Sequence, residues 1–305
     1  MDDKLTSTFK MVCDQGSIRA VAIALDQEPS TISRRLTALE DELGIQLLER
    51  RKKGAIPTEA GTLLLHHLRS QAAEFEALTA EFDALRGMRR GNIGLAVGDG
   101  FVSDLVKHAL PTFKQAYPAI TFDMRSGSTE TVVQDIQNDA AHLGFVFNAK
   151  PDSQCKVLAH TAQPLALLVS PRSDWADMSA PVSINALATL PAALLSSGSG
   201  IGAMVQEVET IYGVRLNRAL RANSLAAVRN FVREGLGVTV LPPFVVAQEI
   251  ADGTIAALPL DVPEFARGEV SLIARSGRRL PEIAMKLANH AMRSMQAFQS
   301  PQQRR

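Results

Sequence analysis

The chain has 305 residues, which is too long for one ordinary hydrophobic core, so two or three domains are expected. Hydrophobic residues make up 46% and charged residues 21% of the chain, as in soluble globular proteins, and no apolar run is long enough to cross a membrane. The formal net charge is zero, so the total charge by itself favours no class of partner.

The N-terminus and the cysteines indicate a compartment. Residues 1–4 lack the basic start and apolar run of a secretion signal, so a cytoplasmic protein is expected. Cys13 and Cys155 lie far apart, and neither has a second Cys or His at the spacing of metal ligands. We therefore expect a reducing environment, with no structural disulfide and no metal site.

Three short helical patterns open the chain. Apolar residues from Leu5 to Val12 repeat at helical spacing and predict a first helix. Ser17 is a good N-cap for a second helix, and Pro29 suits the first position of a third. In the third helix the apolar residues recur at spacings of four, three and four, and Gly44 closes it.

The third helix leaves polar side chains on its other side or along its rim, namely Ser30, Thr31, Ser33, Arg34 and Arg35. Two helices joined by a short turn, the second with hydroxyls and arginines near its start, suit insertion into the major groove of DNA. Arginine can pair with a phosphate or form two hydrogen bonds to guanine. An ordinary three-helix bundle with a solvated face is the alternative that this pattern leaves open.

A cationic segment follows, formed by Arg50, Arg51, Lys52 and Lys53. Four consecutive cations before a glycine suit a short β-wing that contacts the phosphate backbone. Thr58 then caps a new helix.

The stretch from Gly16 to Gly61 resembles the winged helix-turn-helix of LysR-type transcriptional regulators. The matching residues are Gly16, Ser17, Ala22, Leu25, Ser30, Ser33, Arg34, Leu39, Glu40, Leu43, Gly44, Leu47, Arg50 and Pro57 to Gly61. The resemblance implies sequence-specific binding to double-stranded promoter DNA. The residues expected at the DNA are Ser17, Pro29, Ser30, Thr31, Ser33, Arg34, Arg35, Arg50, Arg51, Lys52 and Lys53.

The turn before the third helix departs from the family pattern. Family members usually have an apolar residue, Ser and Gln there, whereas this chain has Gln27, Glu28 and Pro29. Glu28 replaces the usual capping serine and would bring a carboxylate close to phosphate. Pro29 removes a side-chain amide that family members often direct at bases, so the family's base specificity is not carried over to this chain.

A long helix without proline is expected from Thr58 to about Leu85. Its apolar residues fall on a heptad-like seam, formed by Leu64, Leu68, Phe75, Leu78, Phe82 and Leu85. A seam of this length exceeds what a small winged domain can cover, so we expect it to dimerise. Packing of the helix on its own domain is the alternative. The resemblance also implies a linker-helix dimer, and the whole protein is expected to be a dimer or a tetramer.

After Gly91 the pattern changes to alternating strands and helices, which is typical of an α/β fold with mostly parallel sheets. Strands are expected at 92–97, 120–125, 143–147, 165–169, 190–195, 219–222, 238–241 and 270–274. Helices are expected at 102–117, 131–139, 201–212, 225–234 and 243–250, and from residue 280 onward.

The family resemblance extends into this region through the segment from Val232 to Pro242, which matches a recurrent signature of the LysR-type sensor domain. The resemblance implies a periplasmic-binding-protein-like sensor with two α/β lobes and a ligand cleft between them. The expected fold is therefore α+β multidomain, with a winged helix-turn-helix at 1–60, a dimerising linker helix at 61–90 and an effector-binding domain at 91–305. Lobe one would cover 91–163 and 268–295, and lobe two 164–267.

Four segments suit a ligand site, because each lies at the end of a predicted strand or directly after it, and the crevice of such sheets lies beyond the carboxyl ends of the strands. They are residues 98–101, 126–129, 147–148 and 196–201, and they match effector-binding positions of the family. The expected effector-binding residues are Phe101, Ser128, Thr129, Asn148, Ser197 and Ser199. Each of these could equally be a turn or cap residue. Their hydroxyls and amides suit a small polar metabolite such as a carboxylate, whereas Asp99 at the mouth leaves a cationic or neutral ligand open.

Motifs of catalysis are not found. The glycine-rich segment 198–202 lacks the spacing of a dinucleotide-binding loop, and His66 and His67 are adjacent and cannot chelate from one helix face. We expect no catalytic residues, no cofactor and no membrane contact. The alternative function is that of a small-molecule solute-binding protein without a transcriptional role, which the missing export signal and the winged motif both oppose.

Overall fold

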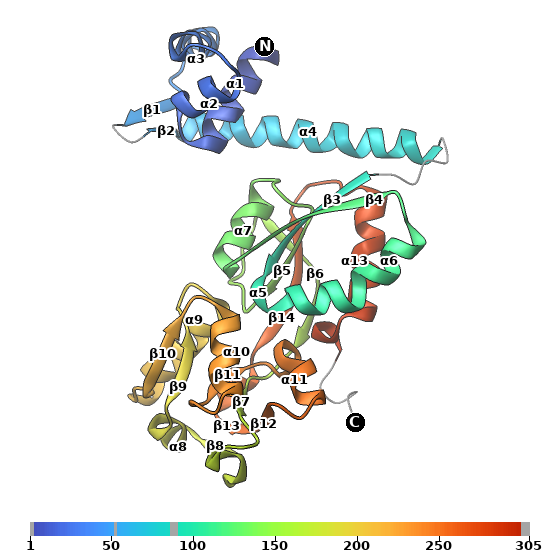
Figure 1. Ribbon diagram of the computed structural model, residues 1–305. Helices are drawn as coiled ribbons and strands as arrows, with labels where there is room; N and C mark the ends of the chain where they lie inside the picture. Colours follow the sequence, from blue (N-terminus) through green and yellow to red (C-terminus); the bar gives the residue numbers. More distant parts are fainter. Residues whose placement is uncertain (1–2, 52–53, 86–90, 300–305) are drawn as a thin grey trace. The chain divides into compact units, whose positions relative to one another are not determined.

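The computed structural model describes residues 3–51, 54–85 and 91–299 (Figure 1). The chain divides into two compact units, Met1–Glu76 and Ala77–Arg305, and each is described by itself. Among the described residues, no helix combines the length and the apolar character needed to cross a bilayer.

The first unit is a winged helix-turn-helix. Its elements are α1 (Asp3–Gln15), α2 (Ile18–Ala24), α3 (Pro29–Leu43), β1 (Leu48–Arg51), β2 (Gly54–Pro57) and the first part of α4 (Glu59–Leu85). The apolar stripes that predicted the three helices meet in one core, in which Phe9, Val21, Ile32 and Leu39 are fully buried. Hydrophobic burial on three converging helix faces therefore fixes the unit.

The ends of these helices follow from local chemistry. Gly16 and Gly44 both take left-handed backbone conformations, with φ of 65° and 66°, and end α1 and α3. The Ser17 hydroxyl accepts a hydrogen bond from the Ala20 amide at 3.3 Å and caps α2. The Thr58 hydroxyl accepts one from the Gly61 amide at 3.0 Å and caps α4.

Helix α4 is one continuous helix of 27 residues, as its sequence predicted. An ion pair between Arg69 and Asp14, with 2.6 Å between nitrogen and oxygen, ties its first half to the end of α1. The direction of α4 relative to the helix-turn-helix is thus set within the first unit.

Lobe one of the second unit is built on a five-stranded sheet with strand order β4-β3-β5-β14-β6. Its strands are β3 (Gly91–Gly98), β4 (Ile120–Gly127), β5 (Leu143–Phe147), β6 (Cys155–Ala162) and β14 (Glu269–Arg275). Its helices are α5 (Asp99–Asp104), a π-helical turn (Leu105–Ala109), α6 (Leu110–Ala116), α7 (Thr129–Gln137) and α13 (Glu282–Ser294), and a short 3-10 turn (Gln296–Phe298) follows. Strand β3 runs parallel to β4 and β5, whereas β14 is antiparallel to both of its neighbours.

Lobe two contains the remaining elements. Its strands are β7 (Ala166–Val169), β8 (Val182–Ser183), β9 (Ala192–Leu195), β10 (Arg218–Ala222), β11 (Thr239–Leu241), β12 (Ala256–Leu258) and β13 (Leu260–Asp261). Its helices are α8 (Ile184–Thr189), α9 (Gly200–Tyr212), α10 (Leu225–Arg233), α11 (Ala247–Ala251) and α12 (Pro263–Ala266), with 3-10 turns at Asp174–Asp177 and Pro243–Val246. Strands β9 and β10 are parallel, and β7 pairs antiparallel with both β11 and β12.

Three expectations from the sequence are corrected. The helix expected at 102–117 begins earlier, at Asp99, and is interrupted by the π-helical turn before α6. The helix expected at 243–250 is a 3-10 turn followed by a short α-helix. Strand β6 was not expected, because it lies at the edge of the sheet and all of its residues are partly or fully exposed, so its sequence lacks a buried apolar pattern.

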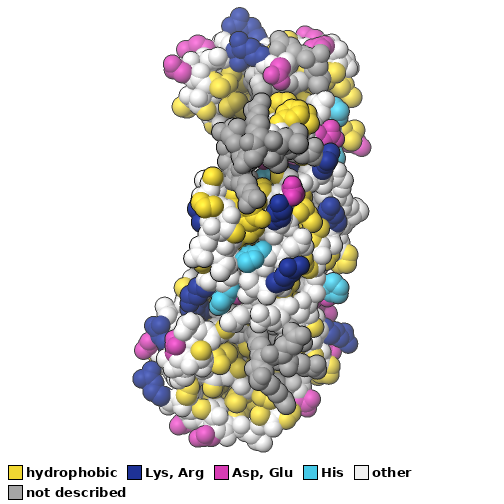
Figure 2. All heavy atoms as spheres, turned by 90° about the vertical axis from the view of Figure 1, so that its right-hand side faces the viewer, with side chains coloured by type: hydrophobic (Ala, Val, Ile, Leu, Met, Phe, Trp, Pro, Cys, Tyr) yellow, Lys and Arg dark blue, Asp and Glu magenta, His cyan; other side chains and the backbone are white. Residues whose placement is uncertain are grey.

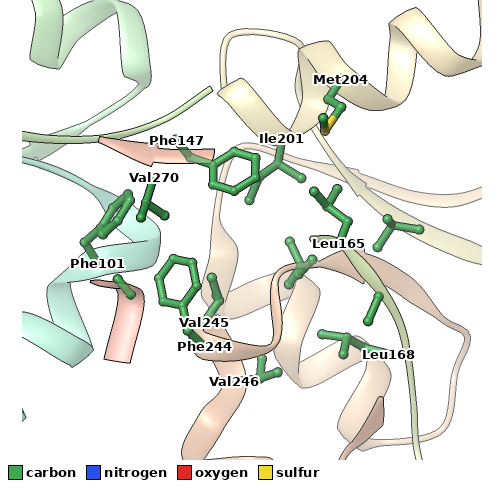
Figure 3. Packing of buried hydrophobic residues seen from close by; sticks show 14 of the residues in the cluster. Phe101, Phe147, Leu165, Leu168, Ile201, Met204, Phe244, Val245, Val246 and Val270 are labelled. Carbon is green, nitrogen blue, oxygen red and sulfur yellow. The ribbon is translucent and has the colours of Figure 1, made fainter. Parts of the chain in front are cut away.

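The two lobes share one hydrophobic cluster that runs from the sheet of lobe one into lobe two. Figure 3 shows the junction, where Phe101 and Val270 from lobe one face Phe244 and Val245 from lobe two. The ring centroids of Phe101 and Phe244 lie 5.3 Å apart. This apolar junction holds the elements that surround the cleft described below.

Candidate functional site

The helix-turn-helix exposes the start of its second helix. Residues 25–28 connect α2 to α3, and Asp26 takes a positive φ of 51° in this turn. Pro29 begins α3, and Glu28 occupies the N-cap position without a side-chain capping bond. Because Glu28, Pro29 and Ser30 are exposed, the first turn of α3 is open to a partner.

Adjacent arginines of α3 have different surroundings. Arg34 is exposed and lies along the start of the helix, where it donates to the Ser30 carbonyl at 3.4 Å and to the Thr31 hydroxyl at 3.5 Å. Arg35 is half-buried and donates to the Thr8 hydroxyl of α1 at 3.5 Å. Of these two expected DNA contacts, Arg34 lies on the open face, and Arg35 lies against the neighbouring helix.

The remaining expected residues of this helix are partly enclosed. Thr31 and Ser33 are half-buried beside the exposed Ser30 and Arg34. The Ser17 hydroxyl is engaged in capping α2. Thr31 and Ser33 therefore border the exposed residues of α3, and Ser17 belongs to the start of α2.

The hairpin of β1 and β2 is fixed to the helices by hydrogen bonds that its backbone amides and the amide just before it donate. One carboxylate oxygen of Glu40 accepts from the amides of Leu47 at 2.8 Å and Leu48 at 3.1 Å. The Ala55 amide donates to the Gly16 carbonyl at 2.9 Å, and a Cβ at Gly54 would lie 2.2 Å from the same oxygen, so the approach requires glycine there. Lys52, Lys53 and the side chains of Arg50 and Arg51 lie outside the described residues.

Helix α4 carries exposed apolar side chains beyond its contact with the first unit's core. Leu64 and Leu68 pack against that core, so this end of the expected dimer seam makes contacts within its own chain. Phe75, Leu78 and Phe82 are 71%, 44% and 50% exposed. Leu63, which the seam did not include, is 70% exposed. The Leu85 side chain lies outside the described residues.

A cleft of about 310 Å³ lies between the two lobes. It is lined by the ends of strands and the starts of the helices that follow them, and its residues are Gly98, Asp99, Gly100, Phe101, Gly127, Ser128, Thr129, Phe147, Leu195, Ser196, Gly198, Ser199, Gly200, Ile201, Asn223, Leu225, Phe244 and Val245. Four of the expected effector-binding residues line this cleft: Phe101, Ser128, Thr129 and Ser199.

Thr129 joins the two lobes at the cleft. Its hydroxyl donates to the Phe147 carbonyl of lobe one at 3.2 Å and accepts from the Gly200 amide of lobe two at 3.2 Å. A Cβ at Gly200 would lie 1.9 Å from the Phe147 oxygen. The close approach of α9 to the end of β5 therefore depends on glycine at this position.

Two serine hydroxyls of the cleft are engaged as helix caps. Ser128 accepts from the Thr131 amide at 3.2 Å at the start of α7, and Ser199 accepts from the Gly202 amide at 2.9 Å at the start of α9. The caps fix the directions of both helices, whose N-terminal ends carry partial positive charge toward the cleft region. In its described lining residues the cleft has one ionisable group, the Asp99 carboxylate.

Two expected effector-binding residues lie elsewhere. Asn148 is not among the residues that line the cleft. It takes a left-handed conformation with φ of 51° after β5, and its backbone amide donates to the Glu269 carbonyl at 2.8 Å. Ser197 lines a neighbouring cavity of lobe two. Ser196 also lines the cleft, within the expected segment 196–201, although it was not among the residues singled out. Asn223 lines the cleft outside the four expected segments, although it follows strand β10 and the same rule applies to it.

Both cysteines are neutral thiols at neutral pH. Cys13 and Cys155 are not joined to each other, and burial raises the pKa of Cys13 to about 12 and that of Cys155 to about 11. At neutral pH both groups therefore remain protonated and are poor nucleophiles.

On the face drawn in Figure 2, the described basic and acidic side chains are dispersed among neutral ones.

Two known protein-family models match the chain, one in each unit. Residues 4–62 match the bacterial regulatory helix-turn-helix protein of the lysR family, and residues 86–296 match the LysR substrate binding domain. The regulator BbuR of Bordetella bronchiseptica is 26% identical over 262 residues, which are 85% of this chain and 80% of that protein. The RuBisCO operon transcriptional regulator of Allochromatium vinosum is 25% identical over 277 residues, 90% of each chain.

Solved structures share the fold. Full-length OxyR from Pseudomonas aeruginosa matches with a TM-score of 0.69 at 19% identity and covers 96% of this chain and 95% of its own. CbnR in complex with its target DNA matches with a TM-score of 0.53 at 21% identity, covering 96% and 99%. The effector binding domain of QuiR in complex with shikimate matches with a TM-score of 0.57 at 17% identity, covering 67% and 96%.

These relatives are transcriptional regulators, which favours a regulator over the solute-binding alternative. The two matching family models follow each other along the chain and cover the helix-turn-helix and both lobes. The chain therefore belongs to the LysR family and is a DNA-binding transcriptional regulator with an N-terminal helix-turn-helix and a C-terminal effector-binding domain.

Proposed function

We propose that the protein is a cytoplasmic homo-oligomer that binds promoter DNA through α3 and the β1–β2 hairpin and responds to a small metabolite in the cleft between its lobes. The observation that carries the DNA-binding part is the open first half of α3, where Pro29, Ser30 and Arg34 are exposed after a short turn. Small polar side chains allow a helix to approach base edges closely, and an exposed arginine there can reach guanine or phosphate.

The proposed DNA contacts divide by role. Ser30, Thr31, Ser33 and Arg34 would face the major groove, and the cationic hairpin residues 50–53 would contact phosphates on one side of it. Ser17 and Pro29 would lie near DNA phosphates at the starts of their helices, where the helix dipole carries partial positive charge. Arg35 would act mainly by holding α3 on α1 through Thr8.

Dimerisation is proposed to occur through α4. Phe75, Leu78 and Phe82 recur at spacings of three and four and are substantially exposed in a single chain. Burying them against a second copy would remove apolar surface from water and place two recognition helices about one two-fold axis. A dimer so built reads two half-sites, which multiplies a modest affinity for each one.

The proposed effector is a small metabolite with an apolar body and an oxygen-bearing polar end. Phe101, Phe147 and Phe244 offer apolar walls, whereas the starts of α7 and α9 offer amides and partial positive charge to an oxygen. A carboxylate end fits these helix starts, provided that it lies away from Asp99. The fold neighbour QuiR, whose effector binding domain holds shikimate, supports a ligand of this size and polarity.

The proposed response is a shift between lobe arrangements. An effector that contacts both lobes binds the closed arrangement more tightly and so favours it. In an oligomer, a changed arrangement of the lobes would alter the distance between the pairs of helix-turn-helix domains that bind DNA.

A footprint over the intergenic region beside the protein's own gene tests the proposal. We expect protection of two patches whose centres are separated by about 10 base pairs or a multiple of this, because two-fold related helices enter successive major grooves. An unrelated duplex of equal length serves as control. Absence of any affinity for duplex DNA at low ionic strength would contradict the proposal.

A further inference from the structure

Lobe two carries a second cavity, of about 570 Å³, on the side of α9 that faces β9 and β10. Three arginines line it: Arg215, Arg218 and Arg221. Ser197, Gln206 and Thr210 add hydroxyl and amide groups to the same lining. The cavity is therefore larger than the cleft and rich in hydrogen-bond donors.

The charges of this cavity do not cancel. Glu209 is buried, pairs with Arg218 and accepts a hydrogen bond from the Leu216 amide at 2.8 Å, so one arginine is neutralised and held in place. Arg215 and Arg221 are exposed, and no acidic partner is found for either within the part of the chain that the structure describes. The lining thus keeps an excess of positive charge.

We propose that this cavity is a second ligand site, which binds a metabolite through a phosphate-class anion. The planar guanidinium presents paired donors that match phosphate oxygens, and several arginines around one cavity can share the charge of a dianion. The cleft between the lobes lacks arginine and lysine in its described lining, so the two cavities select different chemistry. This inference goes beyond the proposed function, which concerns the cleft.

A single loop lies between the two cavities. Ser196, Gly198 and Ser199 line the cleft, whereas Ser197 lines the arginine cavity. An anion that fixes this loop from one side changes the position of the cap of α9 on the other. Binding at the two sites is then coupled, and the coupling is reciprocal.

Calorimetric titration of the full chain with inorganic pyrophosphate, at constant ionic strength, tests the site. We expect saturable binding of one pyrophosphate per chain and weaker binding of orthophosphate. In the double variant Arg215→Gln/Arg221→Gln, the affinity for pyrophosphate should fall by roughly tenfold or more for each of the two arginines removed. Arg172→Gln/Arg293→Gln removes the same charge at exposed positions outside the cavity and should bind like the wild type. Hydrogen exchange should show slower exchange of amides 194–202 when pyrophosphate is bound.

Equal affinity of the two double variants for pyrophosphate would overturn the proposal, since the anion would then be held by overall charge. Absence of saturable pyrophosphate binding to the wild type would also overturn the proposal. A change of oligomeric state in Arg215→Gln/Arg221→Gln would then show that the arginines face another copy of the chain. Retained circular dichroism of both double variants verifies that they fold. Either failure leaves DNA binding and the cleft untouched, so it is distinguishable from failure of the proposed function.

Discussion

Arg34 and Arg35 are consecutive, yet the helix turns their side chains toward different surroundings. Successive helical residues point about 100° apart, so one arginine remains on the open face while the other meets α1 at Thr8. The exposed guanidinium retains its freedom to pair with phosphate or guanine. The half-buried guanidinium already has an acceptor within the protein.

Substitution should separate these roles. Arg34→Ala is expected to weaken promoter binding and to reduce the slope of log affinity against log salt by about one, because one phosphate or base contact is lost. The free energy of unfolding of Arg34→Ala should stay within about 0.5 kcal/mol of the wild-type value, as for substitutions at other exposed sites. Titrations of DNA mobility at several salt concentrations measure the effect, with Arg172→Ala, which removes an exposed arginine of the second unit, as the control. An unchanged salt slope for Arg34→Ala would remove this residue from the interface.

At the scale of elements, α4 has two kinds of apolar surface. Its first turns bury Leu64 and Leu68 in the core of the first unit, and the Arg69–Asp14 ion pair fixes this end. Further along, Leu78 and Phe82 are about half exposed in the single chain. The seam that was expected to dimerise along its whole length is therefore shared between intramolecular packing and an exposed stretch.

Charge on the exposed stretch should separate the protomers. Leu78→Glu/Phe82→Glu is expected to shift the full chain toward smaller oligomers in sedimentation, since two unpaired carboxylates would be buried at the proposed contact. Thr62→Glu adds negative charge at an exposed position of the same helix that is not part of the seam, and it should leave the oligomer intact. If the double variant sediments like the wild type, the dimer contact lies elsewhere.

At the scale of the whole second unit, the two lobes meet through both apolar and polar contacts. Phe101 packs on Phe244 across the junction, and the Thr129 hydroxyl bridges Phe147 and Gly200. Such contacts position the cleft walls before a ligand arrives.

Gly200 offers a direct test of the lobe contact. In Gly200→Ala the new Cβ would meet the Phe147 oxygen, so the lobes must separate locally, and we expect a loss of about 1–3 kcal/mol in the free energy of unfolding. Gly198→Ala is the matched control, since a Cβ there meets nothing within 4 Å. Chemical denaturation compares the two variants. Equal stabilities would contradict the close contact between α9 and β5.

Much of the fold could be predicted from local patterns. Buried strands such as 143–147 and capped helices such as the one that begins after Ser17 carry their signals within a few residues. Edge strand β6 could not be predicted, because its exposed side chains follow no apolar alternation. In the cleft, Ser128, Thr129 and Ser199 were reached from the rule that ligands lie beyond strand ends, whereas Asn148 follows a strand but turns away.

The helix-turn-helix, the long α4, the alternation of strands and helices and the family could all be predicted from the amino-acid sequence, because they depend on periodicity, caps and motifs that are local in the chain. Which side chains share a cavity became known from the folded structure alone. Ser196 and Ser197 are neighbours in sequence but line different cavities. The cavity of Ser197 is also lined by Arg221, which lies in strand β10, and by Arg215, which lies just before that strand. The physical reason is that side-chain direction and distant strand pairing, which no local pattern encodes, set what faces a common space.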